Sequence, residues 1–144
     1  MTLTPIASNH AVDDDPRRYE HLSTIRLEDP EAVARAAKSR RRHPGLKSGR
    51  QNFIVAADHP ARGALAVGND PVAMADRRQL LDRLQIALAN PAVDGILASP
   101  DIMDDLLLLG ALDGKLVFGS MNRGGLSGLV NEFDDRFTGH TAAA

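Results

Sequence analysis

The chain has 144 residues, with 17 Lys and Arg against 19 Asp and Glu and a formal net charge of −2. A chain of this length holds about one domain, and its near-balanced charge argues against a general binder of nucleic acids or membrane surfaces. Cysteine is absent, which excludes disulfide bonds, thiolate metal sites and a cysteine nucleophile.

The first fifty residues are predicted to lie outside the main fold. Residues 1–20 show no apolar periodicity and contain an acidic triplet, so they are predicted to form a mobile arm. Residues 21–50 are predicted to hold an N-terminal helix followed by a basic linker. That helix is predicted to open with Asp29 as its N-cap and with Pro30 and Glu31 in its first turn.

Three short apolar runs follow, and each is typical of a buried strand. They cover residues 53–57, 95–98 and 115–119, and helical patterns from Asp70 and from Ser99 separate them. The alternation predicts an α/β fold built from parallel βαβ units. The spacing favours residues 51–144 as about three βα units of a (β/α)8 barrel. An open doubly wound sheet is the alternative that spacing leaves open.

Candidate site residues follow the first strand, because parallel α/β proteins build their sites at the carboxyl ends of strands. Asp58 and His59 stand side by side there and are candidate catalytic residues for acid–base chemistry. Arg62 is a candidate for binding an anionic group of a substrate. The alternative interpretation is local: Asp58 caps a loop and His59 hydrogen-bonds its neighbours.

The ends of the other two strands carry different signals. Residues 99–101 (Ser-Pro-Asp) are interpreted as a helix start. After the third strand, a polar and glycine-rich run offers donors for a phosphate. The candidate substrate-binding residues in that run are Asn122, Arg123, Gly124 and Gly125. The run is neither a Walker loop nor a GxGxxG fingerprint, so a flexible loop is its alternative.

Other features of the chain argue against a metal site, a cofactor, a nucleic-acid partner and a membrane partner. Asp134 and Asp135 have no histidine or further carboxylate at ligand spacing, so we predict no metal site and no cofactor. The basic residues between 35 and 50 are diluted by acidic neighbours and have no interleaved aromatic residues, which argues against a nucleic-acid partner. No apolar run could span a bilayer and no signal pattern opens the chain, so we predict a cytoplasmic protein with no membrane partner.

Three segments of the chain carry a family resemblance. Residues 54–63 (IVAADHPARG), 119–126 (GSMNRGGL) and 134–139 (DDRFTG) resemble a bacterial (β/α)8 family related to class I, Schiff-base aldolases of the archaeal fructose-bisphosphate and deoxyribose-phosphate aldolase-like group. The likeness covers residues 22–144, and members often accompany inositol-catabolism genes. The resemblance implies a carbon–carbon lyase that acts on a phosphorylated sugar or a keto acid. In that superfamily a strand-borne lysine forms an iminium with the substrate, and Asp58 and His59 match a motif that assists proton transfer.

The chain departs from that pattern in its lysines. Lys38 and Lys47 precede the first strand, and Lys115 opens the third strand at the end opposite the site. We therefore expect a truncated aldolase-like chain that is inactive alone, and that self-associates or depends on a partner fragment; a full-length protein is expected to form a homo-oligomer. The alternatives are a non-catalytic sugar-phosphate-binding fragment and a nucleic-acid binder that uses the basic segment.

Overall fold

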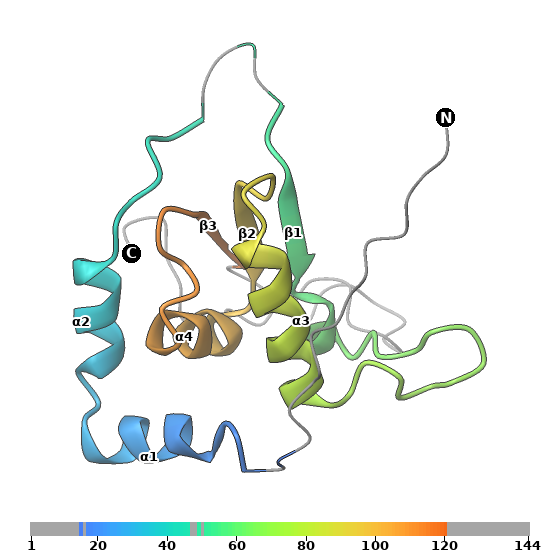
Figure 1. Cartoon of the computed structure of the whole chain (residues 1–144). Coiled ribbons are helices and arrows are strands. Elements are labelled where there is room, and N and C mark those ends of the chain that lie inside the picture. Colours follow the sequence, from blue (N-terminus) through green and yellow to red (C-terminus); the bar gives the residue numbers. More distant parts are fainter. Residues whose placement is uncertain (1–14, 16, 47–48, 50, 121–144) are drawn as a thin grey trace, which may run out of the picture.

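The computed structural model describes residues 15, 17–46, 49 and 51–120. Within these residues lie four α-helices, three strands and a short 3-10 turn (Figure 1). In chain order they are α1 (Glu20–Glu28), α2 (Ala32–Ser39), β1 (Ile54–Ala57), η1 (His59–Arg62), α3 (Arg77–Ala89), β2 (Gly95–Ala98), α4 (Pro100–Leu108) and β3 (Leu116–Gly119). The predicted arm lies outside the described residues except for part of its last six positions.

The three strands form one parallel sheet in the order β1-β2-β3. Val55 pairs with Ile96, and Ile96 pairs in turn with Val117. The predicted α/β class and its parallel strands are therefore confirmed. The described residues form a three-stranded sheet in which β1 and β3 are the outer strands, and no further strand of the predicted barrel lies among them (Figure 1). A βα unit has a similar length in closed and open sheets, so spacing could not decide between them.

The core lies on the side of the sheet that the helices cover. Ile96 and Ala98 of β2 are fully buried there, and Leu81 of α3 and Leu106 of α4 pack in the same cluster. Side chains alternate between the two faces of a strand, so Leu97 and Phe118 point to the other face. Phe118 is 38% exposed. The sheet therefore has one helix-covered face and one apolar face that the described residues leave partly open.

Helix α3 begins later than the sequence suggested. Asp70 and Pro71 lie in a turn, where the Asp70 carboxylate accepts a hydrogen bond from the Val72 amide at 2.9 Å. Asp-Pro pairs open turns as readily as helices. The true N-cap is Asp76, whose carboxylate accepts the amide hydrogen of Arg78 at 2.8 Å. A hydrogen bond from the Arg78 side chain lowers the pKa of Asp76.

The N-terminal segment also differs from its prediction, because it holds two helices instead of one. Asp29 ends α1, and α2 follows with Glu31 as its N-cap residue. The Asp29 carboxylate pairs with Arg35. Leu22 is the only fully buried residue of α1, and a helix with such a thin apolar stripe gives little periodic signal.

A buried carboxylate joins three helices. Asp105 of α4 is 3% exposed and accepts hydrogen bonds from Arg26 of α1 at 2.6 Å and from Arg77 of α3 at 2.5 Å. Arg77 also donates to the Asp101 carboxylate at 2.5 Å. We call these four residues the Asp105 cluster. Because hydrogen bonds to charged groups are the stronger ones, the cluster holds α1 against the α3–α4 layer.

A second polar contact anchors the chain just before α1. The Tyr19 hydroxyl donates to the Asp82 carboxylate at 2.6 Å and accepts a hydrogen bond from the Gln85 amide at 2.7 Å. The Arg18 guanidinium pairs with the same carboxylate. Burial, and then the hydrogen bond to Asp82, raise the pKa of Tyr19 to about 12.

The tyrosine anchor gives a direct spectroscopic prediction, since Tyr19 is the single tyrosine of a chain without tryptophan. We expect the ultraviolet absorbance of tyrosinate to appear near pH 12 instead of about pH 10. Because the folded chain holds this proton more tightly, its free energy of unfolding is expected to fall as the pH rises from about 10 towards 12.

The matched variants are Asp82→Asn and, as a control on the exposed side of α1, Glu28→Gln. Asp82→Asn is expected to lower the pKa of Tyr19, and Glu28→Gln is expected to leave it unchanged. A titration of Tyr19 near pH 10 in the unmodified chain, with its far-ultraviolet dichroism intact, would contradict the described contact.

Gly95 opens the central strand at a point of very close packing. A Cβ atom added there would lie 2.3 Å from the carbonyl oxygen and 2.6 Å from the Cβ of Leu116, its partner in β3. Atoms at such distances overlap, and a backbone neighbour cannot rotate away. Glycine is therefore required at this position by the spacing of β2 and β3.

Candidate functional site

The strand register brings three polar residues to the carboxyl edge of the sheet. Ala57, Ala98 and Gly119 are aligned as the last residues of β1, β2 and β3. The residues that follow them are Asp58, Ser99 and Ser120. The Ser120 amide still donates to the Ala98 carbonyl at 3.1 Å, so the row extends one residue beyond β3. We call Asp58, Arg62, Ser99 and Ser120 the carboxyl-edge site.

A single 3-10 turn returns the chain to Asp58. The turn η1 contains Pro60 near its start and ends at Gly63, whose φ of +72° is a left-handed conformation that favours glycine. This turn places the Arg62 Nε atom 3.4 Å from the Asp58 Oδ2 atom. The candidate catalytic residue Asp58 and the candidate anion-binding residue Arg62 therefore lie together at the sheet edge.

The Arg62 guanidinium is only loosely held. Its side chain is 38% exposed, and its buried Nε atom makes no hydrogen bond to the described residues. The contact with Asp58 has the distance of an ion pair but not the geometry of a hydrogen bond. Arginine presents five donors, and the described residues leave most of those of Arg62 without an acceptor.

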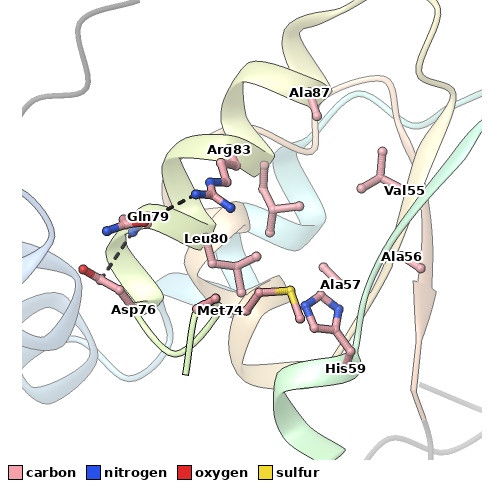
Figure 2. A pocket seen from close by; sticks show the side chains of 12 residues that line it. Val55, Ala56, Ala57, His59, Met74, Asp76, Gln79, Leu80, Arg83 and Ala87 are labelled. Atoms are coloured by element: carbon pink, nitrogen blue, oxygen red, sulfur yellow. Dashed lines mark hydrogen bonds between the residues drawn. The ribbon is translucent and has the colours of Figure 1, made fainter. Parts of the chain in front are cut away.

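His59 lines a cavity that neither Asp58 nor Arg62 lines. Its imidazole lines this cavity between β1 and α3 together with Met74 and Leu80 (Figure 2). The His59 Nε2 atom is buried and has no hydrogen-bond partner among the described residues. Sequence analysis missed these neighbours, because Met74 lies in the long connection 63–76, where no periodic pattern predicts its path. An acid–base role for Asp58 and His59 stays a prediction.

Ser99 occupies the helix-start position that its sequence indicated. It precedes α4, and its hydroxyl donates to the Asp101 carboxylate at 2.5 Å. Ser99 is 4% exposed, so this hydroxyl is fixed inside the edge. Ser99 therefore supports the carboxyl-edge site from within and exposes little surface to a ligand.

The remaining predicted site residues cannot be placed. Asn122, Arg123, Gly124 and Gly125 lie outside the described residues, as do Asp134 and Asp135. Within residues 15–120, as far as they are described, no group of three potential metal ligands occurs. No helix in the described part of the chain is long and apolar enough to cross a membrane.

Comparisons with known proteins place these features in context. The Cgl0159-like family matches residues 50–144. The crystal structure of Cgl0159 from Corynebacterium glutamicum is similar, with 54% sequence identity and a TM-score of 0.79. The match covers 89% of this chain but 43% of that one, so this chain spans less than half of the length of Cgl0159. No curated protein matches the chain.

These matches correct the family expectation drawn from the sequence. The matching family is the Cgl0159-like family and not an aldolase family, so the assignment to the Schiff-base aldolases and the link to inositol catabolism are wrong. The segments that suggested them are short, and an Asp-His pair or a glycine-rich loop at a strand end serves many unrelated parallel α/β proteins. Self-association stays a prediction that rests on the two open sheet edges.

Proposed function

The chain belongs to the Cgl0159-like family, and from the geometry of its sheet edge we propose that it binds a small phosphorylated sugar at the carboxyl-edge site. The observation that carries this proposal is the Arg62 guanidinium. It lies beyond the end of β1, it is partly exposed, and it makes no hydrogen bond to the described residues. Ligands of open α/β sheets bind outside the carboxyl ends of the strands.

The charges at the edge suit a phosphate that is attached to a polyol. A guanidinium binds phosphate oxygens through two parallel hydrogen bonds. The Asp58 carboxylate, 3.4 Å from Arg62, can accept hydrogen bonds from sugar hydroxyls. An acceptor beside the guanidinium suits a ligand with hydroxyl donors, which a phosphorylated sugar carries and a simple keto acid lacks.

The segment after β3 supplies further candidates for the same ligand. Ser120 lies at the sheet edge, and Asn122, Arg123, Gly124 and Gly125 follow it within five positions. Glycine-rich backbone offers amide donors that can approach a phosphate closely. We include these four residues in the proposed site on their sequence alone.

Calorimetric titration with glycerol phosphate, inorganic phosphate and glycerol tests the proposal. We expect glycerol phosphate to bind more tightly than inorganic phosphate, and glycerol to give no measurable heat. Arg62→Gln removes the charge-assisted contact and is expected to weaken glycerol phosphate binding about tenfold or more.

Arg41→Gln is the matched control. Arg41 is 78% exposed and pairs with Asp113, which precedes β3, so it lies at the opposite edge of the sheet. This variant removes the same charge and is expected to leave binding unchanged. Equal losses in both variants would show a nonspecific charge effect and would contradict the proposal, as would the absence of glycerol phosphate binding.

A further inference from the structure

A separate cavity lies between the edge strand β1 and helix α3. It has a volume of about 280 Å³. Its walls are mostly apolar, and they include Val55, Ala57, Leu80 and Leu84 (Figure 2). We call this cavity the β1–α3 cleft. It opens on the helix-covered side of the sheet, and the carboxyl-edge site shares none of its lining residues.

Two polar groups of the cleft lack strong partners. The His59 Nε2 atom is buried without a hydrogen bond to the described residues. Arg83 of α3 is exposed, and its one hydrogen bond to a described residue is the long contact of 3.5 Å from its Nη2 atom to the Gln79 side chain (Figure 2). No carboxylate of the described residues forms an ion pair with Arg83.

The other charged group that lines the cleft is already engaged. Asp76 caps α3 and contacts the Arg78 guanidinium at 3.3 Å, so its negative charge is balanced locally. The cleft thus combines an apolar wall with one exposed cation, Arg83, which forms no ion pair with a described carboxylate. An anion with an apolar body would satisfy both, since it would remove apolar surface from water while it pairs with the guanidinium.

We propose that the β1–α3 cleft binds a medium-chain carboxylic acid. The carboxylate pairs with Arg83, the hydrocarbon chain lies against Val55, Leu80 and Leu84, and an ω-hydroxyl group, where the acid carries one, hydrogen-bonds to His59. A cavity of about 150 Å³ holds benzene. A cleft of about 280 Å³ therefore takes an acid of roughly ten non-hydrogen atoms, which is the size of octanoate.

Titration with octanoate and with its uncharged amide, octanamide, tests the proposed role of Arg83. We expect octanoate to bind, and we expect the affinity for octanamide to be lower by about tenfold or more. Arg83→Gln is expected to reduce octanoate affinity to that of octanamide, while Arg41→Gln leaves both unchanged. Equal affinity of the two probes for the unmodified chain would overturn the proposal.

A second pair of measurements tests the role of His59. We expect ω-hydroxyoctanoate to bind more tightly than octanoate, and His59→Phe to abolish this difference while octanoate binding persists. A preference for ω-hydroxyoctanoate that survives in His59→Phe would overturn the assignment of His59. Arg62→Gln is expected to leave octanoate binding intact, so failure of the phosphate site and failure of the cleft are distinguishable.

The alternative occupant of the cleft is a second copy of the chain, and one further variant distinguishes a bound carboxylic acid from a dimer interface. Ala87→Glu places a carboxylate in the cleft wall and is expected to abolish octanoate binding with no change in sedimentation velocity. A dimer that Ala87→Glu dissociates, together with no octanoate binding to the unmodified chain, would assign the cleft to a protein interface and overturn the proposal.

Discussion

Asp105→Asn is expected to lower the free energy of unfolding by about 3 kcal/mol, because it removes the buried charge that accepts charge-assisted hydrogen bonds from two helices. The Asp105 carboxylate is 3% exposed and accepts hydrogen bonds from both Arg26 and Arg77. Asparagine keeps the shape of the side chain but carries no charge. Two guanidiniums on different helices would then face a neutral amide.

Urea denaturation followed by circular dichroism measures this loss, and the preceding residue supplies the control. Asp104 is 39% exposed and lies 4.0 Å from Arg26. Asp104→Asn removes a more exposed charge from the same helix and is expected to cost about 1 kcal/mol or less. Equal effects of the two substitutions would show that the Asp105 cluster contributes no more than surface charge does.

Leu106→Ala is expected to cost about 2–5 kcal/mol in unfolding free energy, since it removes buried methyl groups and leaves a cavity. Leu106 is 0% exposed and lies in the core cluster with Ile96 and Leu81. The side chain therefore joins α4 to the central strand and to α3. A well-packed site of this kind cannot collapse fully around the smaller residue.

Leu27→Ala is the matched control for Leu106→Ala. Leu27 of α1 is 84% exposed, so the same substitution removes little buried surface, and alanine is at least as good a helix former as leucine. We expect a change within about 0.5 kcal/mol. A loss at position 27 as large as the loss at position 106 would contradict the described core.

The strands could be predicted because their sequences are short apolar runs with clear breaks. The run 95–98 matches β2, and the predicted first and third strands each begin one residue before β1 and β3. Helix boundaries were harder to predict from the sequence, since Asp70-Pro71 and Asp29-Pro30 have the composition of helix starts but lie in or near turns. Tertiary packing decides such cases. Whether a sheet of such strands closes into a barrel or stays open is encoded by no local pattern.

The candidate site was predictable in part. Strand order places Asp58 at the carboxyl edge, and the turn at Pro60 brings Arg62 beside it. The direction of His59 was not predictable, because it depends on Met74 and Arg83, which reach β1 through the connection 63–76 and α3. Contacts between segments so distant in sequence leave no signal in a single chain.

The close approach of Leu116 to Gly95 limits what natural variation can do at this point of the sheet. A mutation to any other amino acid would force β3 to move away from β2, so such a change should survive selection only together with a rearranged third strand. Homologous sequences that align with this region can therefore be sorted by position 95. Those with glycine should keep the register of Gly95 with Leu116, and those without it should have abandoned that register.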